Sequence, residues 1–145
     1  MPESEILRRV AVAAPAEVAK TLRLPPESKV ISMSRLRRLG GEPVLAEQIW
    51  LAFDRFKALL DLEETEIGPL LYPIYEDACS EIVARAEEEL TAEACSNKHA
   101  ELLGLKKGTP VIVIDRTAFG YDDTPLEWRS SRGRADEFQY HVEIR

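Results

Sequence analysis

Apolar and polar positions follow the same order twice along this chain. Residues 18–36 (VAKTLRLPPESKVISMSRL) recur 81 positions later as residues 99–117 (HAELLGLKKGTPVIVIDRT). Six residues are identical in the two copies: Ala19/Ala100, Leu22/Leu103, Leu24/Leu105, Val30/Val111, Ile31/Ile112 and Arg35/Arg116. In each copy a helical pattern leads into a strand, and then through a turn into a second strand. Such a duplication predicts one sheet with approximate two-fold symmetry and a ligand cleft between its halves.

The same pattern predicts the elements around the two copies. Alternation of apolar and polar positions favours strands over residues 6–14, 30–38, 44–51, 109–121, 126–132 and 138–144. Helical signals favour helices over residues 15–22, behind the N-cap candidate Asp54, from Pro69 to about Asp77, and over Asn97–Leu103 with Asn97 as cap. Residues 81–94 fit either a helix or a long strand. No linker-like tract divides the chain, so we expect one domain over residues 1–145.

Composition narrows the classes of function. A chain of 145 residues can bury one core without disulfides or metal. Its formal net charge of −7 argues against direct binding of DNA by this chain. Cys79, Cys95 and the two histidines lack metal-ligand spacing, so we expect reduced thiols in a cytoplasmic protein without metal or cofactor. No apolar run approaches the roughly 20 residues that span a bilayer, so we expect no membrane partner.

Candidate chemistry is confined to one pair of arginines. No nucleophile with a neighbouring base, phosphate loop or metal motif is present, which predicts a protein that is not an enzyme. Arg35 and Arg37 lie two apart on a predicted strand and share a face, where two guanidiniums can hold a carboxylate or phosphate. A solvated outer face is the alternative. Because Ile31 and Met33 share that face, the arginines need an anionic partner, either a ligand or the internal candidate Glu47.

The hairpin that carries these residues has a testable register. We expect Arg35 to lie across the hairpin from Glu47, with both arginines and Glu47 facing one cavity. A plain two-residue turn at Gly40-Gly41 would pair Arg37 with position 44 and turn Glu47 to the other face. The prediction therefore requires an odd-numbered loop, for example with a bulge around residues 39–42.

The succession of these pieces resembles the UTRA domain, the effector-binding module of the HutC branch of the GntR family of bacterial transcription regulators. The resemblance runs from about Ala14 onward and rests on Arg35-Leu-Arg37 with Glu47, Leu-Leu-Tyr72, the RAEEEL run from Arg85, and Pro125-Leu-Glu127. It implies an α+β fold similar to chorismate lyase, with a mostly antiparallel sheet and flanking helices. It also implies a small anionic metabolite as effector, a homodimer, and DNA binding only through a winged helix-turn-helix that this chain does not contain.

The resemblance also carries over the positions of a binding site. The effector-binding residues that it implies are Arg35, Arg37, Glu47, Tyr72 and Glu127, and the residues implied as pocket lining are Leu70, Arg85, Ser131 and Gly133. Sugar-phosphate-sensing members often have a serine at the position of Leu70 and a tyrosine at that of Gly133. These departures favour a different ligand, bulkier or less phosphorylated. A chorismate-lyase-like enzyme acting on a small carboxylate is one alternative, and a purely structural dimerisation module is another.

Overall fold

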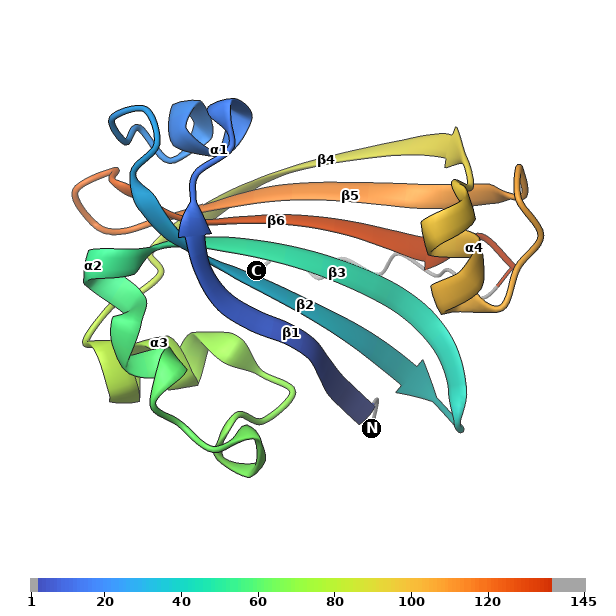
Figure 1. Ribbon diagram of the computed structural model, residues 1–145, viewed down its shortest axis with the longest axis horizontal. Helices are drawn as coiled ribbons and strands as arrows, with labels where there is room; N and C mark the ends of the chain where they lie inside the picture. Colours follow the sequence, from blue (N-terminus) through green and yellow to red (C-terminus); the bar gives the residue numbers. More distant parts are fainter. Residues whose placement is uncertain (1–2, 137–145) are drawn as a thin grey trace, which may run out of the picture.

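The computed structural model describes residues 3–136, which form a six-stranded antiparallel sheet with helices on both faces (Figure 1). The strand order is β1-β2-β3-β6-β5-β4. The strands are β1 (Glu3–Ala13), β2 (Lys29–Leu39), β3 (Glu42–Ala52), β4 (Arg85–Ala94), β5 (Pro110–Phe119) and β6 (Pro125–Arg134). The helices are α1 (Ala16–Thr21), α2 (Phe53–Phe56), α3 (Leu71–Cys79) and α4 (Asn97–Leu103), with 3₁₀ turns η1 (Lys57–Leu60) and η2 (Glu64–Glu66). The predicted α+β class is confirmed.

The register of the sheet repeats the duplication seen in the sequence. Strands β3 and β6 pair at the centre, where Gln48 lies opposite Ser130. Arg35 lies opposite Glu47 in the first hairpin, and the corresponding Arg116 lies opposite Arg129 in the second. Both hairpins carry a register shift at the same place, after Arg37 in β2 and after Ala118 in β5. The approximate two-fold axis therefore passes between β3 and β6.

The first hairpin has the predicted pairing and a different turn. Leu39 lies opposite Glu42, so Gly40-Gly41 is a two-residue turn and the predicted odd-numbered loop is wrong. Both glycines have positive φ, +58° and +81°, as a tight hairpin turn requires. The register is corrected further along β3, where Arg38 pairs with Pro43 but Arg37 pairs with Leu45. Val44 is the extra residue of this bulge, and it brings Glu47 opposite Arg35.

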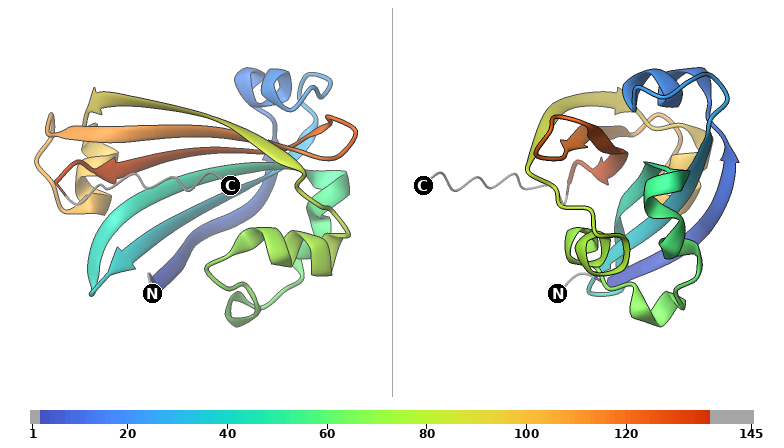
Figure 2. Two further views of the ribbon diagram at one scale, coloured as in Figure 1. Left: turned by 180° about the vertical axis from the view of Figure 1, so that it is seen from behind. Right: turned by 90° about the vertical axis from the view of Figure 1, so that its left-hand side faces the viewer.

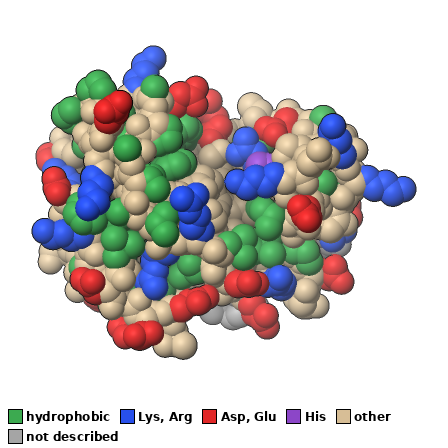
Figure 3. Space-filling view, viewed as in Figure 1, with side chains coloured by type: hydrophobic (Ala, Val, Ile, Leu, Met, Phe, Trp, Pro, Cys, Tyr) green, Lys and Arg blue, Asp and Glu red, His purple; other side chains and the backbone are tan. Residues whose placement is uncertain are grey.

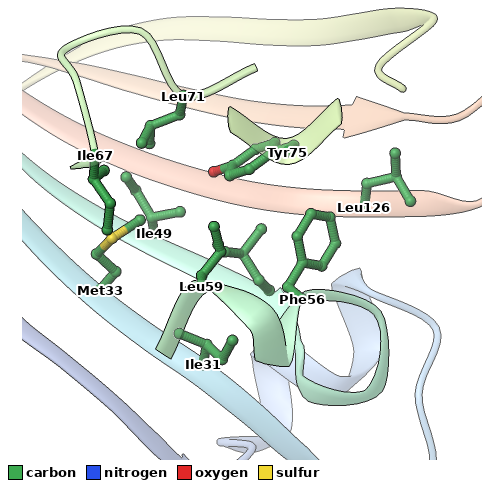
Figure 4. Packing of buried hydrophobic residues seen from close by; sticks show 10 residues of the cluster. Ile31, Met33, Ile49, Phe56, Leu59, Ile67, Leu71, Tyr75 and Leu126 are labelled. Carbon is green, nitrogen blue, oxygen red and sulfur yellow. The ribbon is translucent and has the colours of Figure 1, made fainter. Parts of the chain in front are cut away.

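Helices cover the two faces of the sheet differently. Helices α1 and α4 pack on one face, through clusters that include Val18 with Val30 and Leu103 with Leu36. The segment from α2 to α3 packs on the other face, at the opposite end of the sheet from α4 (Figures 1 and 2). In the main core Tyr75 of α3 lies over the sheet, facing Ile49 and Leu126 (Figure 4).

Several predicted boundaries change in the structure. The ambiguous stretch 81–94 contains strand β4, because it pairs with β5 along its whole length despite an Ala- and Glu-rich composition that favours helix. Helix α3 begins at Leu71, two residues after Pro69, and α2 begins at Phe53, so Asp54 lies inside it. The predicted strand 138–144 lies outside the described residues.

The described residues can be examined for disulfides, membrane-spanning helices and metal-ligand clusters. Cys79 and Cys95 are both free thiols. Between residues 3 and 136 no helix is long and apolar enough to cross a membrane. In the same range no group of three or more His, Cys, Asp or Glu side chains is arranged to hold a metal ion.

Candidate functional site

A continuous polar network lies buried between α3 and the sheet. The Arg35 Nε donates to Glu47 Oε1 at 3.0 Å, and the Arg35 Nη2 lies 2.8 Å from the same oxygen. The other oxygen of Glu47 accepts from Arg129 Nη1 at 3.4 Å. Arg129 also donates two hydrogen bonds to Glu127, at 3.1 Å and 2.8 Å, and the Tyr75 hydroxyl donates to Glu127 Oε2. The network thus joins β2, β3, β6 and α3.

The network is charged although it is shielded from water. Arg35 is 1% exposed and Glu127 is 0% exposed. Burial lowers the pKa of Arg35, and Glu47 partly offsets this. Burial also acts to lower the pKa of Arg129, but Glu127, Tyr75 and Glu47 together outweigh it and the pKa of Arg129 is raised. Burial and the neighbouring Glu127 raise the pKa of Tyr75, which therefore stays protonated and donates. Each buried charge is compensated by one of opposite sign, as burial of ions requires.

A cavity of about 290 Å³ opens above this network, at the entrance to α3. Its apolar lining comes from Pro69, Leu70, Leu71 and Pro73, and its polar lining comes from Arg37, Tyr72, Arg116 and Arg129. The segment that carries the apolar wall is fixed to the sheet, because the Arg35 Nη1 donates to the Pro69 carbonyl at 3.1 Å. The site therefore combines a rigid sheet floor with a wall formed by the start of a helix.

Aromatic and cationic groups meet at one side of the cavity. The guanidinium carbon of Arg129 lies 5.7 Å from the centre of the Tyr72 ring. The Arg116 Nη1 donates to the Tyr72 hydroxyl at 3.4 Å, and Arg116 Nε donates to Glu88 at 2.7 Å. Burial acts to lower the pKa of Arg116, but Tyr72 and Glu88 together raise it. Tyr72 thus has one guanidinium over its ring and another at its hydroxyl.

Arg37 differs from the other arginines of the site. Its Nε atom is buried and has no hydrogen-bond partner among the residues that the structure describes. Within residues 3–136 no carboxylate forms an ion pair with Arg37, whereas Arg35 and Arg116 each have one and Arg129 has two. An unpaired guanidinium in a partly enclosed cavity favours an anionic ligand that supplies the missing acceptor.

The structure brings most of the sequence-predicted site residues together, in two layers. Arg37, Tyr72 and Leu70 line the cavity, and Leu70 is 64% exposed at its rim. Arg35, Glu47 and Glu127 lie in the network beneath. The two arginines therefore do not form a common fork for a ligand, because the charge of Arg35 is already paired inside the protein.

The remaining predicted lining residues lie elsewhere. Ser131 is buried on β6 opposite Glu47, beside the network. Gly133 lies further along β6, opposite Leu45, and is not among the residues around the cavity. The structure does not bring Arg85 to the site. Its side chain packs over the Phe119 ring and forms ion pairs with Asp123 and Glu87.

Three residues of the candidate site were not found from the sequence: Arg116, Arg129 and Tyr75. A signal existed for two of them, because Arg116 is the repeat equivalent of Arg35, and Arg129 occupies the position of Glu47 in the second hairpin. The duplication thus places an acid in one half and a base in the other, and the two meet across the central strands. Tyr75 carried no such signal, since its partner Glu127 is 52 residues away.

Known structures share this architecture. The ligand-binding domain of a protein described as a GntR-family transcriptional regulator from Bordetella bronchiseptica superposes with a TM-score of 0.90 at 30% identity, over 100% of this chain and 90% of that one. The effector domain of PhnF from Mycobacterium smegmatis has a TM-score of 0.88 at 19% identity, over 100% of this chain and 88% of that one, and shows the likeness of fold alone.

Two curated relatives are similar in sequence. The transcriptional repressor NagR of Bacillus subtilis is 26% identical over 139 residues, which are 96% of this chain and 56% of NagR. The regulator Rv0792c of Mycobacterium tuberculosis is 29% identical over 147 residues, covering 99% of this chain and 52% of that protein. The chain therefore spans about half the length of the curated relatives that it matches.

Fold, site and relatives define the class of protein as an effector-binding domain of transcriptional regulators. The sequence model of the UTRA domain matches residues 1–139, and the chain belongs to the UTRA domain family. The predicted family is confirmed, and the relatives give no support to a chorismate-lyase-like enzyme.

Proposed function

We propose that the cavity at the start of α3 binds a small organic anion as effector, and that this binding alters DNA binding by a separate winged-helix part of the regulator. The observation that carries the proposal is Arg37, a cavity-lining guanidinium with a buried, unpaired Nε. Arg116 and Arg129 add positive charge on the same wall. The domain acts by binding and not by catalysis, and as part of a DNA-binding regulator it works in the cytoplasm.

The lining also favours a particular kind of anion. Four of its eight residues are proline or leucine, and the only hydroxyl among their side chains belongs to Tyr72. A sugar phosphate needs several polar partners for its hydroxyls, because an unmatched buried polar group is costly. An anion with an apolar body, such as an aromatic or branched carboxylate, matches the site better. Its charged group would meet Arg37, and its body would contact Leu70 and the Tyr72 ring.

Residues of the proposed site divide into contact and positioning groups. Arg37, Tyr72 and Arg116 contact the effector, whereas Arg35, Glu47 and Glu127 hold the cavity in shape from below. Arg35 joins β2 to the segment before α3 through the Pro69 carbonyl. An effector that pulls on this segment can shift α3 against the sheet, and regulation requires only about 1–3 kcal/mol of coupling.

We also propose that residues 1–145 act as one domain and dimerise, since regulators of this type read paired half-sites. One chain has a mass of 16.4 kDa. Light scattering at micromolar concentrations is expected to give about twice this mass. A mass of one chain across the concentration range would refute the dimer.

Substitution of Arg37 by glutamine tests the effector site. A thermal-shift screen of aromatic and aliphatic carboxylates, with matched amides and phosphates, first identifies a stabilising compound. At a hundred times its dissociation constant this compound should stabilise the domain by about 2.7 kcal/mol. The stabilisation should disappear in Arg37→Gln and persist in the control Arg38→Gln, whose arginine is paired with Glu5. Unchanged affinity in Arg37→Gln, measured by calorimetry, would remove Arg37 from the site.

A further inference from the structure

A second cavity, of about 310 Å³, lies on the opposite face of the same two strands, between α4 and the β1–β3 part of the sheet. Its lining includes Leu7, Arg8, Ser34, Gln48, Lys98 and His99. Figure 3 shows this side of the molecule: the surface is hollowed between its left and right parts, and a histidine with neighbouring Lys or Arg side chains lies at the edge of the hollow. The lining also includes Arg35 and Glu47, whose side chains belong to the buried network described above. Neither the family resemblance nor the proposed effector site uses the other lining residues.

The cavity exists because the two halves of the duplication differ at one cross-strand pair. Below α1, Trp50 of β3 lies opposite Trp128 of β6, and both pack against the α1 cluster. The two-fold axis relates that pair to Arg132 of β6 and Ala46 of β3, which lie opposite each other at the α4 end of these strands. A small and a charged side chain thus replace two indole rings. The two tryptophans fill the space below α1, whereas the corresponding space below α4 is left open as the cavity.

The floor of the cavity is polar and fixed. The Ser34 hydroxyl donates to Gln48 Oε1 at 3.0 Å, and the Gln48 amide donates to the Ser32 hydroxyl at 3.0 Å. Such a chain of hydrogen bonds orients the floor before any ligand arrives, which lowers the entropic cost of binding. Next to it, Leu7 is the extra residue of a bulge in β1, because Ile6 pairs with Arg35 and Arg8 with Ser34.

His99 contributes an imidazole ring that is fixed by Ser96. The Ser96 hydroxyl oxygen accepts from the His99 backbone N–H at 3.3 Å and lies 3.0 Å from the His99 Nδ1. The Ser96 hydroxyl thus holds the Nδ1 side of the ring at the start of α4. Burial, together with the positive charges of Arg132 and Lys98, lowers the pKa of His99, so the ring is neutral at pH 7.

The charge of the walls favours an anion. Arg8 on β1 and Lys98 on α4 line the cavity from different elements, and neither forms an ion pair with any residue between 3 and 136. Arg132 also lies close enough to His99 to affect it, but its charge is paired with Glu93 at 3.3 Å. The lining contains two carboxylates, Glu47, which is paired with Arg35 and Arg129, and Glu101. Apolar contact surface comes from Leu7, Ala46 and Leu102.

We propose that this cavity is a second ligand site, which takes a small organic anion with its carboxylate between Arg8 and Lys98 and its apolar body against Ala46 and Leu102. The site is distinct from the effector cavity but not remote from it. Ser34 and Gln48 alternate with Arg35 and Glu47 along β2 and β3, so ligands on the two faces contact neighbouring residues of the same strands. Occupation of one face can therefore influence the other through two strands.

The test is an NMR titration of the ¹⁵N-labelled chain with benzoate, with benzamide as the uncharged match. Benzoate should shift the amide resonances of Ser34, Gln48 and His99 saturably, and benzamide should do so more weakly. The double substitution Arg8→Gln with Lys98→Gln should weaken benzoate binding about tenfold, as two exposed charge contacts can. Arg37→Gln should leave these shifts unchanged, since Arg37 lines the effector cavity and not this one.

A filling substitution supplies an independent control. Ala46→Trp restores the residue that the other half carries and should abolish the shifts at His99. Ala46→Leu is used beside it, because leucine fills part of the cavity with less risk to folding, and a retained thermal transition shows that each variant is folded. Absence of saturable shifts at the α4 face, shifts confined to the Arg37 cavity, or equal affinity for benzoate and benzamide would each overturn the proposal.

Discussion

At the scale of single residues, a ligand can interact with the positive charge that the carboxylates of the protein do not balance. Arg35 and Arg129 are balanced by Glu47 and Glu127, so this group contributes no net charge. Arg116 is paired with Glu88, at 2.7 Å. Arg37 therefore supplies the unbalanced positive charge of the cavity, and a ligand with one negative charge would neutralise it. A doubly charged phosphate would leave excess negative charge against apolar walls.

Tyr75 gives a direct measure of how the network contributes to stability. Replacement of Tyr75 by phenylalanine keeps the ring and removes the donor to the fully buried Glu127. We expect a loss of about 1–3 kcal/mol in the free energy of unfolding, because a buried carboxylate loses a hydrogen bond. Urea denaturation measures it. Tyr121→Phe, at a tyrosine that is 82% exposed, should change stability by less than about 0.5 kcal/mol. Equal effects of the two substitutions would contradict this role.

Reasoning from strand alternation related site residues only within the first hairpin, whereas Tyr72 and Glu127 came from the family resemblance. Arg35, Arg37 and Glu47 lie within one hairpin, so strand alternation alone relates their faces. Arg129 meets Glu47 only because β3 and β6 are neighbours, and that pairing depends on the symmetry of the whole sheet. Local patterns contain no information on whether Arg35 reaches a ligand or an internal acid.

At the scale of elements, the bulge in the first hairpin explains why the turn prediction was wrong although the predicted pairing of Arg35 with Glu47 was right. The prediction required an odd-numbered loop around residues 39–42, but the structure has a two-residue turn at Gly40-Gly41. The extra residue is absorbed at Val44, and its counterpart in the second hairpin lies between Pro125 and Glu127. Because both copies carry the bulge, it belongs to the repeated unit. Val44 and Leu126, the two bulge residues, are ordinary apolar strand residues, so the local sequence does not indicate a bulge at either position.

Helix α4 offers a test that separates the sequence-based cap from the observed one. The pattern predicted Asn97 as cap, but Ser96 occupies that position and its hydroxyl accepts the His99 N–H. Ser96→Ala should reduce the free energy of unfolding by about 0.5–2 kcal/mol. Asn97→Ala should have little effect, since Asn97 is already the first helical residue. Thermal or urea unfolding of the two variants decides between them, and a larger loss for Asn97→Ala would restore the sequence-based assignment.

At the scale of the whole molecule, the duplication provides a symmetric frame and an insertion provides the asymmetric site. Each half consists of a leading strand, a helix and a bulged hairpin, and the strands of both halves form one sheet. The segment from α2 to α3 joins the halves and covers only one end of one face (Figure 2). The effector cavity forms where this segment meets the central strands. Symmetry could be predicted from the repeated sequence, whereas the position of the joining segment depends on tertiary packing.

The central pairing of β3 with β6 predicts that the two halves unfold as one unit. Trp50 and Trp128 lie opposite each other across this seam, one from each half, so their fluorescence reports on the joint between the halves. Far-ultraviolet circular dichroism reports on all six strands. Because the buried network and the main core both cross the seam, separation of the halves would expose paired charges and Leu126 together. The two probes should therefore give coincident urea transitions with one midpoint.

Single-tryptophan variants sharpen this last test. Trp50→Phe leaves Trp128 as the reporter in the second half, and Trp128→Phe leaves Trp50 as the reporter in the first half. For each variant, the transition seen by fluorescence should match the one seen by circular dichroism. Each substitution removes part of the α1 cluster, so both midpoints should move to lower urea concentration. If fluorescence changed at a lower urea concentration than circular dichroism, the seam would open before the halves unfold. The duplicated units would then be separate folding units, and the single cooperative domain would be refuted.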